Sequence, residues 1–466
     1  MEIMEGFAFE EGCKERLSVI GLGKLGCSML ACFAHKGWHV IGVDVLEENV
    51  NIINKGRSPI YEPMVNDLIE LNKVRVEGTT DIKYAVLNSE ISFIIVPTPS
   101  KEDGSFSTEY VEKVAVDIAR ALREKDTYHV IVITSTVLPG DTARITEKIA
   151  KESGRASNEF GVCYNPDFIA LGKIVSDFMN PDMILIGESS KEAGSIVEEI
   201  HRKLVNKRPS IYRMTPHNAE LAKIALNAYC TLKITFANTI AEICENMPTG
   251  NSATVLNAIG SDSRVGRKYF KGGLAYSGPC FPRDNRALSH TARGYGVDKI
   301  FCDITDEINE YHKMERISKF LMEYLDEKGT DELAVLGLSY KEDTPIIEES
   351  VSIAAIRALS EKGVKLSLYD PAAMENAEEE LVNMGNITFA NSEYDCVKGK
   401  SVCFIATPWK QFYKLDAKKL LEYMGENAVI IDAWGVIGFE RASTPNREKV
   451  IEIRKIGKSQ IVKFEL

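Results

Sequence analysis

The feature that most constrains the fold is a glycine pattern near the start of the chain. Gly21, Gly23 and Gly26 have the spacing G-x-G-x-x-G in "GLGKLG", after an apolar run and before a helical segment. The first glycine permits a tight turn, the second lets the backbone approach a pyrophosphate, and the third allows close packing of helix on strand. The helix N-terminus then faces the phosphate charge. The spacing alone also occurs in merely structural turns.

A carboxylate at the end of the next apolar run strengthens this interpretation. Asp44 is the last residue but one of "HVIGVDV", 18 residues after Gly26. An acidic residue at this place accepts a hydrogen bond from the ribose 2'-hydroxyl and repels a 2'-phosphate. We therefore predict a dinucleotide site that prefers NAD to NADP and that includes Lys24 and Leu25 at the helix start.

Apolar runs then alternate with helical segments along the first half of the chain. Strands are expected at 91–99, 129–136, 160–167 and 182–187, and the segments 108–124 and 190–205 have the pattern of helices. This alternation predicts a mostly parallel, doubly wound sheet. Such sheets bind ligands at the carboxyl ends of their strands, which here carry Pro97, Thr98, Ser135 and Thr136. The same hydroxyl and proline residues are equally typical of ordinary turns.

A long helix and a second alternating block follow. Residues 217–247 have apolar residues at helical period up to Pro248, over a length that suits a bridge between two domains and a dimer contact. Strands are expected again at 333–340, 365–370, 401–407 and 428–434. The second block lacks a full glycine fingerprint, so we expect it to bind something other than a dinucleotide, or nothing. The fold class is therefore α/β, with two Rossmann-like doubly wound domains joined by a long central helix.

Composition excludes several classes of function. The 466 residues are 44% apolar, which suffices for two or three domains. The net charge of -12 argues against nucleic acid or an anionic membrane as a partner. Neither the ten cysteines nor the seven histidines form a metal-binding or disulfide pattern, so no metal is expected. Residues 1–16 do not resemble a signal peptide, and no apolar run could span a bilayer. We expect a soluble, cytoplasmic protein.

The chemistry of the chain is concentrated in two further stretches. In "GPCFPRDN", glycine and prolines frame Cys280, which predicts a rigid loop presenting a thiol to a ligand. Lys223 and Asn227 stand at i and i+4 of the long helix, so an ammonium and an amide share one face and suit an oxyanion. The plainer alternatives are a small buried cysteine and a solvated helix face.

These motifs together resemble the UDP-glucose/GDP-mannose dehydrogenase family. The resemblance covers residues 16 to about 440 through "GLGKLG", "PIYEP", "VPTPS", "STVLPG", "NPDF", "AELAKIALNAY", "GSDSRVG", "GPCFPRD", "GLSYKEDT" and "YDPAA". It implies an enzyme that uses NAD twice to oxidise the C6 alcohol of a nucleotide sugar such as UDP-glucose to the uronic acid. The implied domains are an NAD-binding domain at 16–215, a central helical dimerisation and catalytic-loop region at 216–325, and a nucleotide-sugar-binding domain at 326–466.

The resemblance also implies roles for single residues. Cys280 would be the nucleophile that forms a thiohemiacetal and then a thioester. Lys223 and Asn227 would stabilise the oxyanion, Thr136 and Asp284 would assist proton transfer, and Asp167 would help to activate water. The implied substrate-binding residues are Phe168, Lys223, Asn227, Arg264 lent by a neighbouring subunit, Tyr276, Gly278 and Lys341. A homodimer or larger homo-oligomer is expected.

The sequence departs from the family pattern at several positions. Asp167 replaces a glutamate, Leu171 a frequent glutamate, Glu348 and Trp434 frequent arginines, and Arg283 a frequent lysine. These changes leave the thiol chemistry intact and put the sugar, base and cofactor contacts in question. The alternatives are a 2-acetamido nucleotide-sugar dehydrogenase and a non-catalytic sensor of nucleotide sugar or NAD. A two-electron hydroxyacid dehydrogenase would not need Cys280.

Overall fold

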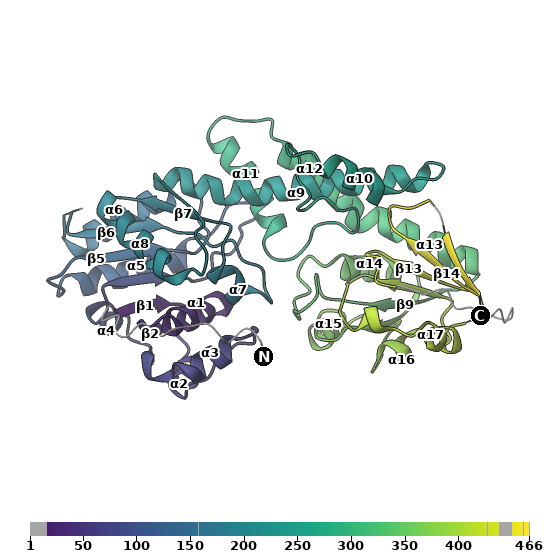
Figure 1. Cartoon of the computed structure of the whole chain (residues 1–466), viewed down its shortest axis with the longest axis horizontal. Helices are drawn as coiled ribbons and strands as arrows, with labels where there is room; N and C mark the ends of the chain where they lie inside the picture. Colours follow the sequence, from purple (N-terminus) through teal and green to yellow (C-terminus); the bar gives the residue numbers. More distant parts are fainter. Residues whose placement is uncertain (1–15, 157, 426, 438–449, 460, 466) are drawn as a thin grey trace. The chain divides into compact units, whose positions relative to one another are not determined.

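The computed structural model describes residues 16–156, 158–425, 427–437, 450–459 and 461–465. Cys13 and most of the N-terminal segment considered above lie outside these residues. The described chain forms two compact units, which divide between Ala225 and Leu226. We call them the N-terminal and the C-terminal unit and describe each by itself (Figure 1).

The N-terminal unit is built on one sheet with the strand order β3-β2-β1-β4-β5-β6-β7-β8. Its strands are β1 (Arg16–Ile20), β2 (His39–Val43), β3 (Val76–Thr79), β4 (Ile91–Ile94), β5 (His129–Ile133), β6 (Phe160–Tyr164), β7 (Met183–Glu188) and β8 (Ser210–Met214). Neighbouring strands from β3 through β6 pair in parallel. This confirms the predicted doubly wound sheet, whose carboxyl edge collects the loops after these strands.

Helices cover both faces of this sheet. One face packs against α1 (Lys24–His35), α3 (Val65–Leu71), α7 (Ile174–Met179) and α8 (Lys191–Leu204), and the other against α4 (Ile82–Leu87), α5 (Glu109–Leu122) and α6 (Asp141–Ser153). α2 (Glu47–Asn54) lies beside β3. The strands are apolar on both faces because both faces are covered, as in other parallel sheets.

The direction of the last two strands was not predicted. β7 pairs antiparallel with β6, and β8 then pairs in parallel with β7. An apolar run such as "MILIG" fixes a strand but not its direction, which depends on the connection through α7. β8 itself has an alternating and half-exposed pattern at a sheet edge, and we had not predicted it.

The long helix is confirmed as α9 (Pro216–Asn246). It begins in the N-terminal unit and ends in the C-terminal unit, and Pro248 follows its end as expected. Within the C-terminal unit it leads to α10 (Ser252–Gly260), α11 (Phe281–Gly294), α12 (Phe301–Glu310), a π-helical turn η2 (Tyr311–Arg316) and α13 (Ile317–Lys328).

The C-terminal unit contains a second sheet with the order β11-β10-β9-β12-β13-β14-β15. Its strands are β9 (Glu332–Leu336), β10 (Lys365–Tyr369), β11 (Ile387–Phe389), β12 (Val402–Ile405), β13 (Ala428–Asp432), β14 (Val450–Lys455) and β15 (Ile461–Glu465). All neighbouring pairs are parallel except β14 with β15. The second Rossmann-like block is therefore confirmed.

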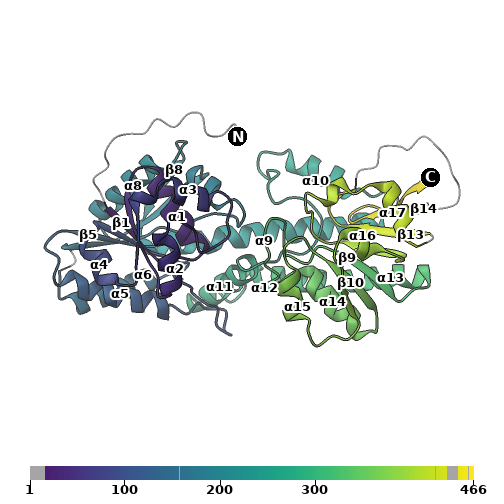
Figure 2. The same cartoon turned by 90° about the horizontal axis from the view of Figure 1, so that it is seen from below.

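The second sheet is also covered on both faces (Figure 2). α13, α14 (Val351–Glu361) and α15 (Met374–Glu380) pack on one face, and α16 (Glu393–Val397) and α17 (Ala417–Tyr423) on the other. In the described part of the chain, no helix is both long and apolar enough to span a membrane.

Candidate active site

The glycine turn after β1 has the geometry that its sequence predicts. Gly21 has a φ of +105°, and a Cβ there would overlap the carbonyl oxygen of Ile95. A Cβ on Gly26 would overlap the carbonyl oxygen of Gly21, so helix and turn are in direct backbone contact. By contrast, nothing lies within 4 Å of the Cβ position of Gly23, the N-cap of α1. The fold thus requires two glycines, while the third leaves room for a pyrophosphate at the helix N-terminus.

Asp44 follows β2 at the same edge. Its Oδ2 accepts a hydrogen bond of 2.8 Å from the backbone N–H of Leu22, and its Oδ1 accepts one of 2.9 Å from that of Leu46. The carboxylate is partly exposed and each oxygen has a further lone pair for a ribose hydroxyl. Together with the open space at Gly23, this arrangement fits NAD, with Lys24 and Leu25 at the first turn of α1.

The loops after β4 and β5 are tied to each other through hydroxyl groups. Ser135 Oγ accepts from the N–H of Val96 at 2.9 Å and donates to its carbonyl at 2.7 Å. Thr98 Oγ1 donates to the carbonyl of Thr136 at 2.9 Å. Ser135 and Thr98 are buried, whereas Pro97 is exposed. These hydroxyls therefore shape the edge of the site, and the direct cofactor contacts of the four residues stay a prediction.

Lys223 is held against the loop after β6. Its Nζ donates a hydrogen bond of 2.5 Å to the backbone carbonyl of Asp167 and lies 4.5 Å from the centroid of the Phe168 ring. The residue is only 9% exposed. Three of the predicted residues are thus in direct contact, and the ammonium is fixed by a carbonyl dipole and an aromatic face.

The Asp167 carboxyl group has an unusual environment. The residue as a whole is partly exposed, but its Oδ2 is buried and has no hydrogen-bond partner among the described residues. Burial raises the pKa of Asp167 to about 7, against the opposing charge of Lys223. Asp167 and Phe168 also line a cavity of about 20 Å³, which is room for about one water molecule. A carboxyl group poised near neutrality beside such a space suits a general base.

Two buried glutamates of the N-terminal unit were missed in the sequence. Glu220, three residues before Lys223 on α9, accepts hydrogen bonds of 2.8 Å from the N–H groups of Gly140 and Thr142 at the start of α6. Glu62 accepts bonds of 3.1 Å from the N–H groups of Gly172 and Ile174. They fix the loops that follow Thr136 and Phe168. The position of Glu220 on the same helix face as Lys223 was an available signal, whereas Glu62 had none.

Cys280 lies at the N-cap of α11 in the C-terminal unit. The predicted loop is therefore too long: residues 281–294 are helical, since Pro282 in the first turn has no N–H to lose and a fixed φ that suits a helix start. Of the nine cysteines that the structure describes, Cys280 is exposed and the others are buried. The positive end of the α11 dipole favours a negative charge at this place.

Buried Asp284 and half-buried Asn227 form a hydrogen-bonded pair next to Cys280. Asp284 lies one turn after Cys280, and its N–H donates to the Cys280 carbonyl at 2.9 Å. Asp284 as a whole is 3% exposed. Its carboxylate accepts a hydrogen bond of 2.6 Å from Asn227 Nδ2. Arg283 Nε lies 3.7 Å from the other carboxylate oxygen. The predicted proton-transfer residue and the predicted oxyanion residue are thus in contact.

The segment before Cys280 is shaped by two contacts. Gly278 has a φ of +81°, and a Cβ there would collide with the ring of Tyr340, directly before Lys341. Tyr276 is 4% exposed, and its hydroxyl donates a hydrogen bond to Asp306 at 3.1 Å. Burial, and then the charge of Asp306, raise the pKa of Tyr276 well above its usual value. Its side chain therefore faces the protein interior, so a substrate contact at this residue is expected from the backbone.

Arg264 projects from the turn after α10. Its side chain is 87% exposed and bonds Asp262 within its own turn at 2.7 Å. Lys233 on α9 holds this turn, because its Nζ donates to the carbonyls of Val265 and Gly266 at 3.1 and 3.2 Å. The exposure suits the predicted contact with a neighbouring subunit.

The structure shows the surroundings of three residues that depart from the family pattern, Trp434, Glu348 and Leu171. Trp434 donates from Nε1 to the carbonyl of Ala406 at 2.7 Å, and its ring fills the space where Gly273 lacks a Cβ. Lys271 donates to the Trp434 carbonyl at 3.1 Å, so a cation lies beside the tryptophan. Glu348 is exposed and Leu171 is half-buried.

The second sheet repeats the glycine turn but uses its carboxylate differently. Gly337 has a φ of +97° and Leu338 N–H donates to Asp370 Oδ2 at 2.7 Å, as Leu22 does to Asp44. Asp370, however, is 1% exposed and also accepts from Ser339 and Trp409. Its hydrogen-bonding capacity is used inside the protein, which leaves nothing for a ribose.

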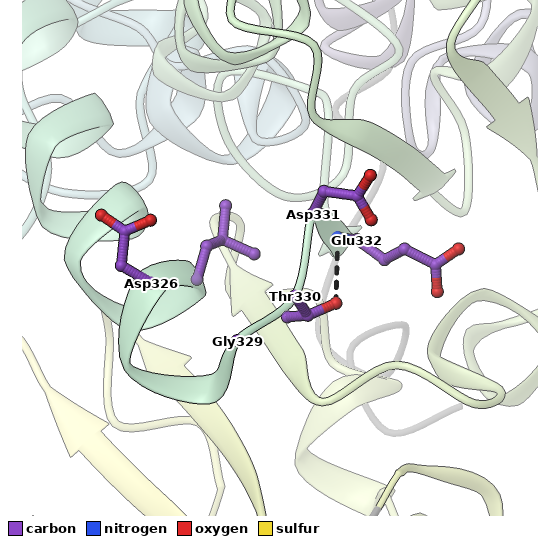
Figure 3. A pocket seen from close by; sticks show the side chains of 6 residues that line it. Asp326, Gly329, Thr330, Asp331 and Glu332 are labelled. Atoms are coloured by element: carbon purple, nitrogen blue, oxygen red, sulfur yellow. Dashed lines mark hydrogen bonds between the residues drawn. The ribbon is translucent and has the colours of Figure 1, made fainter.

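A larger hollow of about 560 Å³ lies at the amino end of β9 (Figure 3). Asp331 and Glu332 line it, and they pair with Lys365 and Lys400 at 3.0 and 3.1 Å. It is at the opposite end of the strand from Lys341, so it does not belong to the candidate site.

Comparison with protein-family models gives three adjacent matches. Residues 15–205 match the NAD binding domain of the UDP-glucose/GDP-mannose dehydrogenase family, residues 217–311 its central domain, and residues 334–438 its UDP binding domain.

Individual proteins are similar over nearly the whole chain. A UDP-glucose 6-dehydrogenase of Haloferax volcanii is 35% identical over 89% of this chain and 95% of its own length. A GDP-mannose 6-dehydrogenase of Pseudomonas aeruginosa is 34% identical over 81% and 85%. The solved structure of a UDP-glucose dehydrogenase from the archaeon Pyrobaculum islandicum has a TM-score of 0.81 at 31% identity and covers 92% of this chain and 96% of that one.

Proposed function

Because the chain belongs to the UDP-glucose/GDP-mannose dehydrogenase family and is an NAD-dependent nucleotide-sugar dehydrogenase, we propose that it oxidises the C6 alcohol of UDP-glucose to the carboxylate through a thioester on Cys280. The observation that carries this proposal is the exposed thiol at the start of α11, one turn before the buried Asp284, which is hydrogen-bonded to Asn227. A two-electron dehydrogenase needs no such thiol.

The cofactor is assigned to the edge formed by the glycine turn, Asp44 and the loops after β4 and β5. The open Cβ position at Gly23 and the remaining lone pairs of Asp44 fit it. When bound, NAD accepts hydride, and two NAD per sugar balance the four electrons. Asp44 would repel the 2'-phosphate of NADP.

The protein residues account for the covalent steps. The Cys280 thiolate attacks the C6 aldehyde carbon, a C–S bond forms, and the carbonyl electron pair moves onto oxygen. The second amide N–H of Asn227 and the ammonium of Lys223 are assigned to that oxyanion, and protonation gives the thiohemiacetal. Loss of the second C6 hydride gives the thioester. Water then attacks its carbonyl, the C–S bond breaks, and thiol and carboxylate are released.

Proton transfers are assigned to the buried carboxyl groups. Asp284 is assigned to the thiol or alcohol proton, and its position one helical turn from Cys280 supports this role. Asp167 is assigned as the base that activates water, on the support of its raised pKa and the small cavity beside it. An aspartate reaches less far than a glutamate by one methylene, so the position of that water is set by the loop of residues 165–169.

We extend the proposal to a cytoplasmic homodimer that uses α9. Tyr229, Phe236 and Ile243 follow one another at seven-residue spacing on this helix and are 51%, 44% and 53% exposed. A regular stripe of large apolar side chains at such exposure is typical of a helix that meets another helix. A second copy of the chain is the proposed occupant, and Arg264 of one copy would then reach the substrate of the other.

The test is turnover on a panel of UDP- and GDP-linked hexoses and 2-acetamido hexoses with NAD. We expect two NADH per molecule of UDP-glucose and formation of the uronic acid, detected by mass spectrometry. Preference for an acetamido or GDP-linked sugar would correct the substrate while keeping the chemistry. Tight binding of nucleotide sugar without NADH formation would favour a sensor.

A further inference from the structure

Two segments of the C-terminal unit that carry predicted substrate or catalytic residues are in direct contact. The segment of Gly278 and Cys280 meets the segment after β9 that contains Lys341. The N–H of Gly278 donates to the carbonyl of Glu348 at 3.2 Å, and the Tyr340 ring occupies the place of a Gly278 side chain. Backbone contacts alone therefore bring the thiol turn and the Lys341 loop together.

A group of charged side chains closes the same contact. Arg286, on α11 after Cys280, donates from Nη1 to Glu349 Oε1 at 3.2 Å. Lys313, from the π-helical turn η2, donates to Glu349 Oε2 at 2.5 Å. The two cations also share Glu310, and Arg286 bonds Asp306 at 2.9 Å. Glu349 is thus the anion that links α11 and η2 to the Lys341 loop.

Because the charged side chains around Glu349 are partly buried, the loss of one of them would leave an opposite charge without its partner. The Lys313 side chain is only 8% exposed, so its charge depends on its two carboxylate partners. Burial alone would raise the pKa of Glu349, but hydrogen bonds and charges of Lys313 and Arg286 outweigh it and lower that pKa. The carboxylate therefore stays ionised through the neutral range.

The backbone of Glu349 is in an unusual conformation. Its φ is +55°, in the left-handed region that residues with a Cβ rarely adopt. Such conformations persist where the surroundings over-determine them and often mark functional sites. Here the result is that two consecutive residues, Glu348 through its carbonyl and Glu349 through its carboxylate, both contact the Cys280 segment.

We propose that Glu349 is a positioning residue, whose carboxylate holds the Cys280 turn against the Lys341 loop through Arg286 and Lys313. Its function is to fix the thiol relative to the loop that receives the nucleotide sugar. The proposal rests on the proposed function in one respect, the role of Cys280 as nucleophile. A misplacement of a reacting group by about 1 Å can lower a rate by about a hundredfold.

The experiment compares the full-length wild-type protein with Glu349→Gln, which keeps the size of the side chain, and Glu349→Asp, which keeps its charge. Glu380→Gln is the matched control, because Glu380 pairs with Arg357 on the exposed surface of α14 and α15 in the same unit. The first readout is the rate of alkylation of Cys280 by iodoacetamide without substrate, followed by peptide mapping so that Cys13 is counted separately. The second is the change in kcat and in both KM values.

We expect Glu349→Gln to change the alkylation rate of Cys280 by at least about threefold and to lower kcat by about tenfold or more. Its KM for NAD should stay within about twofold, because the glycine turn is in the other unit. Glu349→Asp should lie closer to wild type, and Glu380→Gln should match wild type. An unchanged alkylation rate in Glu349→Gln would overturn the proposal, whatever happens to kcat, as would an equal change in Glu380→Gln.

A second variant covers the case in which Glu349→Gln does not fold. Arg286→Lys keeps a cation on α11 but cannot bond Asp306, Glu310 and Glu349 at once. It should shift the alkylation rate in the same direction, and a wild-type rate would contradict the proposal. Since alkylation needs no turnover, this test remains valid if the wild-type protein oxidises no nucleotide sugar, an outcome that would refute the proposed function alone.

Discussion

Asn227 Nδ2 donates a hydrogen bond of 2.6 Å to Oδ2 of Asp284, a residue 57 positions further along the chain. This bond joins the long helix α9 to the first turn of α11, directly after Cys280. An asparagine amide has two N–H donors, so one can hold Asp284 while the other serves an oxyanion. The pair therefore connects the residue that we propose takes a proton with the one that we propose stabilises the oxyanion.

Replacement of Asn227 by alanine should break this connection. The Asp284 carboxylate would lose its 2.6 Å donor while still buried, and the oxyanion would lose an amide. We expect kcat to fall by about 100- to 1,000-fold, the usual loss for one oxyanion donor, with little change in the KM for NAD. Asn246→Ala, at the exposed end of the same helix, is the control and should keep wild-type kinetics. Equal rates for both variants would remove Asn227 from the mechanism.

Cys280→Ser tests covalent catalysis. An alkoxide is harder to generate than a thiolate, and an ester is a slower acyl intermediate than a thioester. We expect near-normal affinity for both ligands and a loss of steady-state turnover of at least about a hundredfold. A sugar ester on this serine is expected in the intact-protein mass spectrum. A wild-type rate of uronic acid formation by Cys280→Ser would contradict covalent catalysis by the Cys280 thiol.

Asp44→Ala should relax the choice of cofactor. We propose that the carboxylate lies where a 2'-phosphate would sit, so its removal should abolish the repulsion. The removal also frees the N–H groups of Leu22 and Leu46. We expect the ratio of kcat/KM for NAD over NADP to fall by at least about tenfold. Asp44→Asn, which retains an acceptor for one of the two N–H groups, separates charge from loop geometry. If the unmodified enzyme uses both cofactors equally well, the role of Asp44 is wrong.

The raised pKa of Asp167 predicts a pH dependence. Burial raises this pKa from 3.8 to about 7, so the folded protein binds a proton between these values that the unfolded chain has lost. This proton stabilises the folded state at acid pH, and the stabilisation is lost as the pH rises through about 7. Activity should rise over the same range, because the base must be deprotonated. Asp167→Asn should remove both trends, as measured by thermal unfolding and by kcat from pH 5 to 9; an unaltered rise of kcat in this variant would assign the base elsewhere.

The shared site can be tested by mixing two inactive chains. Arg264 is 87% exposed and bonds Asp262 within its own turn, so its guanidinium is presented outward. Arg264→Ala and Cys280→Ala chains, once subunits have exchanged, should recover part of the wild-type activity in hybrid dimers. Native mass spectrometry shows whether hybrids have formed. Hybrids as inactive as their parents would exclude a site shared between subunits.

The sequence was sufficient for the parts of the fold that depend on local pattern. Most strands of both sheets, the glycine turn and α9 follow from apolar runs, glycine spacing and helical period, whereas β3, β8, β11, β14 and β15 do not. The direction of β7 could not be predicted, because it depends on how α7 returns the chain to the sheet. The start of α11 at Phe281 differs from the predicted loop. The glycine and prolines of "GPCFPRDN" favour a loop, but proline is also common in a first helical turn.

In the candidate site, too, some features follow from local sequence and others depend on tertiary structure. Residue types indicated Cys280, Lys223 and Asn227, but their partners are non-local. Lys223 bonds a carbonyl 56 residues away, and Glu62 contacts residues more than 100 positions distant. The burial of one oxygen of Asp167 is equally a property of the assembled loop. Candidate residues could thus be chosen by residue type, while the pKa values and positioning contacts required the tertiary structure.

The three glycines of the turn after β1 are required for different reasons, two for folding and one for binding of the proposed cofactor, and this difference has an evolutionary consequence. A side chain at Gly21 or Gly26 would overlap backbone oxygens, so the fold alone requires these two glycines. Gly23, with an ordinary extended backbone and open space around it, would be constrained by the proposed cofactor alone. A lineage released from oxidoreductase selection could therefore lose the cofactor through a single substitution and keep an intact fold, available for a different task.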